Sequence, residues 1–475
     1  MDLLYSKHNS LAFCFKRGWN MALDRVRVRF AAAFAVSFAS ATVFAGRYWQ
    51  GHSEYFSDTA NWSTETGGAG GNSGGSSLPG DGTGATYWKY FRNGKTIFDG
   101  AYSLPSRADI CTFDHSYFVW DALDPSYGFT AADEFRVGSS VDHSLYSYLE
   151  IDDGTYSSTV LRVGYAQTAV AGLTINDGTL TMQKVRVTSA TGSDGTLILN
   201  GGTLTVTSSD NETLSICRDE NTVGTLVVNG GTLNTTNGFV SMGYANNVTA
   251  TLNVRSGTWN ARGFRVGGCQ DSTNPRNISN AVARLVIDGG TFSWASVECG
   301  IGYCTNVGSY AEMVINGGTV NCGHNSFYVG EAGFGKFTIN GGTFTMPDSE
   351  YALTLGHKKV GSDVGIVTFN GGVTTIGRIR VSYAQPGSRV VFNGGMLRAT
   401  RSTTSYLVAS DNVTCELQEG GLSFDTQTFN VEIKHDLVLA DGVASAPLVK
   451  RFRQAQDTGR LAVHARGPRH LRRPG

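Results

Sequence analysis

The stretch FTINGGTFTM at residues 337–346 recurs, with variations, along most of the chain. Related copies are LTINDGTLTM at 173–182, LILNGGTLTV at 197–206 and MVINGGTVNC at 313–322. A period of 23 to 33 residues is typical of a linear repeat protein rather than of several globular domains. The second glycine of the motif, called the marker glycine here, identifies eleven copies: Gly154, Gly178, Gly202, Gly231, Gly257, Gly290, Gly318, Gly342, Gly372, Gly395 and Gly421.

Each copy predicts a half-buried β-strand before the glycines, because apolar residues alternate with other residues, as at Phe337 and Ile339. A second strand follows the glycine turn, and a third segment such as LRVGYA at 161–166 comes later in the copy. Three strands in about 27 residues predict one coil of an all-β parallel β-solenoid. We expect about eleven coils with an N-terminal cap, wound right-handed because parallel crossovers usually are.

The turn after the first strand is also predicted by residue type. Glycine adopts a positive φ without a Cβ clash, and asparagine tolerates left-handed backbone. In stacked coils, asparagine side chains at equivalent positions would lie above one another and form a hydrogen-bonded amide ladder. We favour this structural role over ligand binding. Seven copies have asparagine two residues before the marker glycine: Asn176, Asn200, Asn229, Asn316, Asn340, Asn370 and Asn393.

The first 45 residues have the features of a secretory signal peptide. Arg25, Arg27 and Arg29 precede an apolar run of 16 residues at 30–45, and Met21 is an alternative start. This run is shorter than the roughly 20 residues of a spanning helix, so an N-terminal membrane anchor is the less favoured alternative. Residues 46–134 lack the repeat and are rich in aromatic residues, which indicates a cap or, alternatively, a sugar-binding platform.

The repeats are expected over 135–425, followed by terminal strands or a partial coil at 426–449. Residues 450–475 hold eight Lys/Arg and one acidic residue. We interpret this basic tail as an out-of-frame or truncated end rather than as a site for nucleic acid or anionic lipid.

Composition narrows the function classes. The 475 residues include 61 glycines, 16% are charged, and the net charge is −1, which is typical of a β-rich protein with many tight turns. Removal of Cys14 with the signal peptide leaves seven cysteines, an odd number that excludes complete internal pairing. No CxxC pair or His/Cys cluster occurs, so the sequence predicts neither a metal nor a cofactor site.

One column of charge is a candidate site. Arg136, Arg162 and Arg186 occupy the same position of three successive copies, and Arg265 and Arg380 follow further along. Such an anion stripe could hold an acidic glycan. We favour the alternative that these arginine side chains point outward into solvent and have no carboxylate partners. No HExxH motif occurs, and no catalytic residue is predicted.

Three stretches resemble one family. The repeat, the opening YWQGHSEYFSDTANWS at 48–63 and ADICTF at 108–113 are similar to bacterial proteins with autotransporter-associated β-strand repeats. The resemblance covers residues 46–425 and implies an exported or surface-displayed β-helix of the passenger or adhesin type. Proteins of this family carry a C-terminal membrane anchor, which is not recognisable in this sequence. We therefore expect either that the chain is released from the cell or that its anchor has been lost.

We therefore expect a secreted or cell-surface structural or adhesive protein without enzymatic activity. Its expected partners are surface glycans or other surface proteins, with no nucleic acid and with membrane contact only through export or a lost anchor. The alternative is a β-helix enzyme, a lyase or hydrolase, that binds or cleaves acidic polysaccharides. The ligand, the pairing of cysteines and the oligomeric state are not indicated by the sequence.

Overall fold

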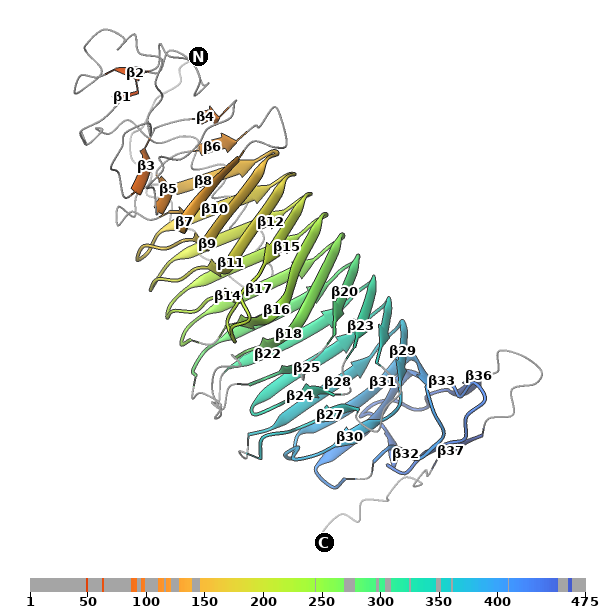
Figure 1. The fold of residues 1–475 in the computed structure, drawn as a ribbon. Helices are drawn as coiled ribbons and strands as arrows, with labels where there is room; N and C mark the ends of the chain where they lie inside the picture. The colour runs from red at the N-terminus through yellow and green to blue at the C-terminus, as the bar shows by residue number, and fades with distance from the viewer. Residues whose placement is uncertain are drawn as a thin grey trace, which may run out of the picture. The chain divides into compact units, whose positions relative to one another are not determined.

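The computed structural model is a parallel β-solenoid of about eleven turns, as predicted, and its described residues contain no helix (Figure 1). The described residues are the short strands at 48–49, 62–63, 87–91, 95–98, 110–114 and 117–120, and residues 128–138, 146–451 and 460–463. Gaps within 146–451 lie at 244, 269–277, 296–298, 304–308, 324–325, 347–351, 360–361 and 409. Within these ranges, no helix is long and apolar enough to cross a membrane.

One coil consists of three strands, one on each face of the solenoid. In the third coil these are β12 (Asp194–Leu199), β13 (Thr203–Val206) and β14 (Leu214–Ile216). In the preceding coil the second and third strands merge into β11 (Thr179–Val187), which pairs in parallel with both β13 and β14. The predicted division into three strands is therefore confirmed, with two faces sometimes joined by one bent strand.

The first face carries the strand that precedes the marker glycine. Leu173 pairs in register with Leu149 on one side and with Leu197 on the other. Its strands are β4 (Lys95–Phe98), β6 (Tyr117–Trp120), β8 (Tyr146–Ile151), β10 (Val170–Ile175), β12, β15 (Val223–Val228), β17 (Thr249–Val254), β19 (Val282–Ile287), β22 (Tyr310–Ile315), β25 (Phe334–Ile339), β28 (Val364–Phe369), β31 (Ser388–Ala399), β33 (Val413–Asp425) and β35 (Leu437–Leu439).

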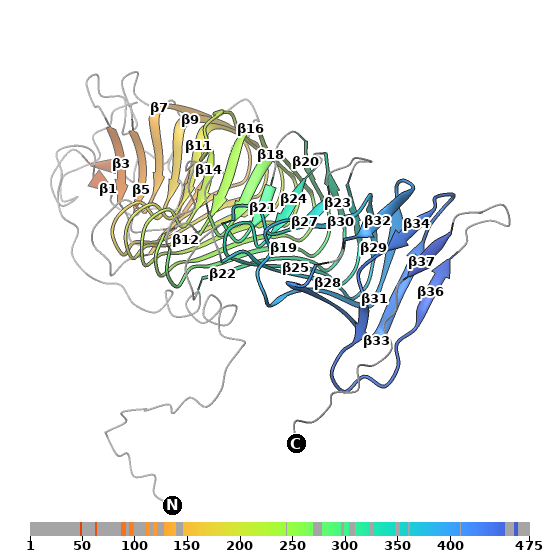
Figure 2. The same cartoon turned by 90° about the horizontal axis from the view of Figure 1, so that it is seen from below.

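The second face follows the glycine turn and stacks in the same way (Figure 2). Thr203 pairs with Thr179 and with Thr232. Its strands are the first parts of β7 (Gly128–Val137), β9 (Thr155–Val163), β11, β16 (Thr232–Met242) and β18 (Thr258–Val266), with β13, then β20 (Thr291–Trp294), β23 (Thr319–Cys322), β26 (Thr343–Thr345), β29 (Val373–Ile376), the ends of β31 and β33, and β36 (Leu448–Arg451).

The third face closes each coil. It begins with β3 (Tyr87–Phe91) and β5 (Ile110–Asp114), which pair in parallel with each other and then with β7. The strands that follow are the last parts of β7, β9, β11, β16 and β18, with β14, then β21 (Cys299–Ile301), β24 (Phe327–Val329), β27 (Leu353–Leu355), β30 (Ile379–Val381), β32 (Thr403–Leu407), β34 (Val431–Ile433) and β37 (Leu461–Val463).

The core lies between the three faces. Ile151, Ile175 and Leu199 are fully buried in one column, so the predicted inward positions are confirmed. Each such side chain contributes about 1.5–3 kcal/mol relative to an exposed one. In the middle of the solenoid aromatic rings fill the interior, as where Trp259 stacks on Phe292 with ring centroids 4.0 Å apart.

The marker glycines make the turn between the first two faces. Ten of the eleven have a positive φ, such as +63° at Gly202, where an added Cβ would lie 2.3 Å from the carbonyl oxygen of Gly178. The exception is Gly395, because β31 continues through the turn and Gly394 has the positive φ, +112°. Stacked turns leave no room for a side chain, so glycine is required by packing as well as by conformation.

The ladder of parallel strands is longer than the predicted repeat array at 135–425. Its first strands, β3 and β4, begin at Tyr87 and Lys95, inside the predicted cap. At the far end, β36 and β37 reach into the predicted basic tail. The predicted signal peptide at 1–45 and the aromatic side chains of the predicted cap lie outside what the structure describes. Among the described strands, β1 (Tyr48–Trp49) and β2 (Trp62–Ser63) form a separate antiparallel pair.

Candidate functional site

The predicted arginine column exists on the third face. Arg136, Arg162 and Arg186 pair in register from β7 through β9 to β11. The same outward position continues through later coils as Ser215, Ser241, Arg265, Gly300, Tyr328, Thr354 and Arg380. We call these residues the arginine column.

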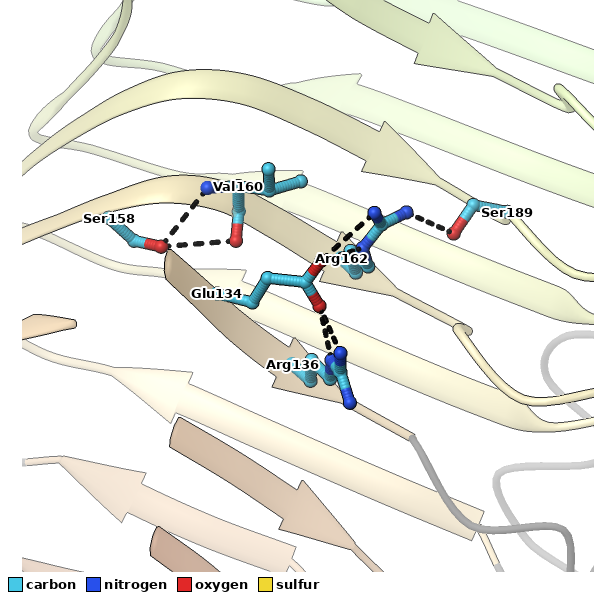
Figure 3. A network of polar contacts seen from close by, with 6 residues as sticks. All are labelled: Glu134, Arg136, Ser158, Val160, Arg162 and Ser189. Atoms are coloured by element: carbon cyan, nitrogen blue, oxygen red, sulfur yellow. Dashed lines mark hydrogen bonds and ion pairs between the residues drawn. The ribbon is translucent and has the colours of Figure 1, made fainter. Parts of the chain in front are cut away.

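Glu134 joins the first two arginines of the column (Figure 3). One of its oxygens contacts the guanidinium of Arg136, and the other lies 3.0 Å from Nη2 of Arg162. Arg162 Nη1 also donates to Ser189 Oγ at 3.2 Å. The guanidinium carbons of Arg136 and Arg162 lie 4.2 and 4.9 Å from the ring centroid of Tyr165, which favours both cations by a cation–π interaction. This group is called the Glu134 cluster.

The Glu134 cluster is partly accessible to solvent, with all three charged side chains 17–18% exposed. Burial by itself would raise the pKa of Glu134, but the hydrogen bonds and charges of Arg162 and Arg136 hold that pKa below its ordinary value. The carboxylate is therefore ionised at neutral pH. It offsets one of the two positive charges and makes the cluster a weaker anion site than two bare arginines.

Arg186 is held more tightly in the next coil. Its Nη1 donates to the backbone oxygen of Glu212 and to Ser215 Oγ, both at 2.8 Å. The Glu212 carboxylate lies 3.5 Å from the same nitrogen and 3.2 Å from Nε of Arg218. Arg186 is buried by these contacts, so its charge faces protein rather than solvent.

The middle of the column holds a fully buried ion pair. Arg265 is 1% exposed and its Nε lies 3.1 Å from an oxygen of Glu331, which is inaccessible to solvent. This contact is ionic, since the N–H is not aligned on that oxygen. The other oxygen of Glu331 lies 3.4 Å from Nδ1 of His357, and the His357 ring stacks on Tyr328 with centroids 3.9 Å apart. This group is called the Glu331 cluster.

Gly300 provides the space for this carboxylate. A Cβ at Gly300 would lie 1.9 Å from Oε2 of Glu331, so no larger residue fits at this position of the arginine column. Burial would raise the pKa of Glu331, but the charge of Arg265 and the contact with His357 hold that pKa below its ordinary value. Glu331 therefore stays ionised inside the protein at neutral pH.

The prediction that these arginines are solvated and lack carboxylate partners is wrong for Arg136, Arg162, Arg186 and Arg265. Glu134, Glu212 and Glu331 each approach one or two arginines of the column, and of the predicted arginines Arg380 alone is classed as exposed. Glu212 and Glu331 were missed because they come from other coils or loops: Glu331 is 66 residues after Arg265 (331 − 265). Glu134 stands two residues before Arg136 on the same strand, and this short spacing was an available signal.

The predicted asparagines form a hydrogen-bonded ladder along one corner. Asn200 Nδ2 donates to Asn176 Oδ1 at 2.8 Å, which is the geometry of stacked amides. The ladder has two parts, because Arg255 and Asp288 replace asparagine in the middle coils. The other amide bonds are Asn229 to Asn200, Asn340 to Asn316, Asn370 to Asn340 and Asn393 to Asn370, at 2.8 to 3.1 Å.

A second ladder lies at the corner before the first face and was not predicted. Asn247 Nδ2 donates to Asn221 Oδ1 at 3.1 Å, and Asn280 Nδ2 donates to Asn247 Oδ1 at 3.0 Å. All three have a positive φ between 55 and 60°. An asparagine two residues before the strand in each of these copies was the signal in the sequence.

From Thr155 to Thr345 the second face presents two outward columns of short polar side chains, called the hydroxyl face. None of its members is charged, and Asn260 Nδ2 donates to Asn234 Oδ1 at 2.9 Å along it. Threonine is stiff at χ1, so this surface loses little rotamer freedom on contact. The members are Thr155, Thr179, Thr203, Thr232, Thr258, Thr291, Thr319 and Thr343, with Ser157, Thr181, Thr205, Asn234, Asn260, Ser293, Asn321 and Thr345 beside them.

The described residues contain no group of three or more His, Cys, Asp or Glu residues that could hold a metal ion. Four described cysteines are buried: Cys217, Cys299, Cys322 and Cys415. Burial raises the pKa of Cys217 to about 11, so this thiol is a poor nucleophile at neutral pH.

No family model, no curated protein and no solved structure matches this chain. The resemblance to autotransporter-associated repeat proteins therefore stays a prediction that depends on the motifs themselves.

Proposed function

We propose that this chain is an exported, non-enzymatic β-solenoid that acts as a structural or adhesive component at the cell surface or outside the cell. The observation that carries the proposal is that arginines of the column form ion pairs with carboxylates of the same chain. An enzyme that cleaves acidic glycans needs cationic groups free to meet the substrate. Here Arg186 and Arg265 are buried, and Arg162 is held by Glu134.

The hydroxyl face supports the adhesive role. A typical hydrogen bond contributes only about 0.5–1.5 kcal/mol net, so one coil would bind a partner weakly. Equivalent donors and acceptors on successive coils allow many weak contacts with an extended polymer or surface at once, which raises the overall affinity without a deep pocket. A neutral glycan or a polar protein surface is the class of partner that suits such a face.

The second candidate is a β-helix enzyme or binding protein for acidic polysaccharides. It is favoured by the Glu134 cluster, where a partly exposed carboxylate lies between two arginines. The low pKa of Glu134 makes it unsuited as a general acid, although an ionised carboxylate can still act as a base.

Purified full-length protein distinguishes the two candidates. We expect no new reducing ends and no unsaturated product from polygalacturonate or other uronate polymers. Release of product that disappears in Arg162→Ala would overturn the proposal in favour of the enzyme.

Adhesion is measured on a glycan array and on immobilised cell-surface material. We expect the double variant Thr181→Lys, Thr205→Lys to reduce binding at least tenfold, since both lysines would project from the hydroxyl face. The matched control is Thr225→Lys, an outward position on the first face of a neighbouring coil. Equal loss in both variants would exclude the hydroxyl face as the adhesive surface.

A further inference from the structure

Asparagine followed by glycine is the dipeptide in which a side-chain amide is lost most readily. The backbone nitrogen of the glycine attacks the side-chain Cγ, a five-membered succinimide forms and ammonia leaves. Water then opens the ring to aspartate or isoaspartate. Glycine favours the attack because it has no Cβ and its backbone is flexible. One such pair, at 93–94, lies outside the described residues. The seven described pairs begin at Asn200, Asn229, Asn237, Asn316, Asn340, Asn370 and Asn393.

Six of the seven asparagines belong to the amide ladder, which holds both ends of each amide. Asn200 Nδ2 donates to Asn176 Oδ1, and Asn200 Oδ1 accepts from Asn229 Nδ2, both at 2.8 Å. The other five likewise donate through Nδ2 and accept through Oδ1. These bonds must break before Cγ can turn toward the following nitrogen, so the ladder opposes the first step of the reaction.

The turns of the ladder also hold the attacking nitrogen. Gly230 N donates to the carbonyl oxygen of Leu199 at 3.2 Å, and Gly371 N donates to that of Ile339 at 3.1 Å, in each case across to the preceding coil. The equivalent bond, at 3.3 to 3.4 Å, is made by Gly201, Gly317 and Gly341. In these copies the two groups that would react are therefore both bound to a neighbouring coil.

Asn237 is the described asparagine of this kind that lies outside the ladder. It belongs to β16, at the corner between the second and third faces. The pairing of β16 with β18 shifts register between Thr235 and Phe239, so Asn237 and Gly238 lie in an irregular part of the strand. The side chain of Asn237 is exposed. Its Nδ2 donates to the carbonyl oxygen of Thr207 at 3.0 Å, but its Oδ1 accepts no hydrogen bond within the described part of the chain.

Packing keeps glycine next to Asn237. A Cβ at Gly238 would lie 2.3 Å from Oγ1 of Thr213 and 2.6 Å from the carbonyl oxygen of Ser208, so no larger residue fits. The fold thus requires a reactive dipeptide at a corner where the ladder does not protect it. We propose that Asn237 is a site of spontaneous deamidation, which releases ammonia and leaves aspartate or isoaspartate, while stacking preserves the asparagines of the ladder.

The product changes the contacts of this corner. A carboxylate has no proton to donate, so the bond from Asn237 to the carbonyl oxygen of Thr207 is lost and the new charge faces that oxygen. Arg262 is the cation beside it, since its Nη1 donates to the backbone oxygen of Asn237 at 3.1 Å. Deamidation therefore adds a negative charge at the edge of the hydroxyl face, none of whose members is charged.

Peptide mass mapping of the folded full-length protein, aged in mildly alkaline buffer made with heavy-oxygen water, tests the proposal. Each asparagine that deamidates gains one heavy oxygen, so the seven positions are measured separately. We expect Asn237 to deamidate at least about tenfold faster than any asparagine of the ladder, because those amides must first break two hydrogen bonds. In urea, which removes the fold, all seven should react at similar rates, since each is followed by glycine.

The variant Asn340→Ala tests the protection itself, and circular dichroism verifies that it folds. It removes the acceptor of Asn370 and the donor to Asn316, so both should deamidate severalfold faster, while Asn200 and Asn237 in distant coils keep their rates. Unchanged rates at Asn316 and Asn370 would overturn the role of the ladder. Ladder asparagines that react as fast as Asn237 in the folded protein, or a rate difference that persists in urea, would overturn the proposal. The inference does not depend on the proposed adhesive function.

Discussion

The Glu134 cluster and the Glu331 cluster lie on the same arginine column but differ in solvent exposure. Glu134 is on β7 itself and pairs with two partly exposed arginines. Glu331 follows β24, enters the space left by Gly300 and meets Arg265 where water is excluded. Outward residues of one column can therefore be either surface or core, depending on what the adjoining loop brings over them.

This difference decides how much each carboxylate contributes to stability. A partly exposed ion pair contributes about 0–1 kcal/mol, because water and salt screen it. A buried pair is different, since removing one partner leaves the other charge without compensation.

Glu331→Gln should destabilise the solenoid by about 3–5 kcal/mol, because Arg265 would be left as a buried charge without its carboxylate. Urea denaturation, monitored by circular dichroism, measures the loss. The matched control is Glu134→Gln, with an expected loss of about 1 kcal/mol or less. Similar losses in the two variants would show that the two clusters do not differ as the geometry indicates.

Gly300→Ala should cost about 1–3 kcal/mol, because the new methyl group would overlap Oε2 of Glu331 and force the carboxylate to move. The double variant with Glu331→Ala removes that overlap, so Gly300→Ala should then add little to the loss already caused by Glu331→Ala. The coupling is measured as a double-mutant cycle in denaturant. Additive losses would place the origin of the glycine requirement elsewhere than in the carboxylate.

Acid should act in part through the Glu331 cluster. The pKa of Glu331 is lower in the folded protein than the ordinary 4.5, so the unfolded chain binds more protons in this window. The stabilisation is fully present above pH 4.5 and is lost as the pH falls through the lower folded pKa. Melting temperatures of the unchanged protein should fall in this range more steeply than those of Glu331→Gln. Parallel curves would contradict the assignment.

Asn200→Ala should have the smallest effect, about 0.5–1.5 kcal/mol, because it removes amide hydrogen bonds at an exposed corner. Hydrogen exchange should show faster opening that is confined to the coils next to Asn200. An effect as large as that of Glu331→Gln would mean that the amide ladder, rather than the buried ion pair, dominates the stability of the solenoid.

Much of the fold could be predicted from sequence because each coil repeats the same short-range rules. The alternation at Phe337 and Ile339 places side chains inside, and the marker glycines locate the turn. The shared position of Arg136, Arg162 and Arg186 within the repeat was sufficient to predict that they pair in register. Each of these predictions depends on residues a few positions apart or on a simple period.

The partners of the arginines could not be predicted in the same way. Loop lengths vary between copies, so nothing periodic indicates that Glu331 folds back over Arg265 or that His357 follows from the next coil. The exposed state of Leu439 and Leu448 was also hidden, because their sequence pattern resembles that of buried columns.

Backbone sterics and the apolar alternation act over a few residues and repeat, so the amino-acid sequence specifies the coil, its inward columns, its glycine turns and the stacking of identical positions. Which outward charges are buried and which apolar side chains stay exposed follows instead from contacts between residues far apart in the sequence. The physical reason is that the cost of a charge or an apolar group depends on whether distant parts of the chain exclude water from it.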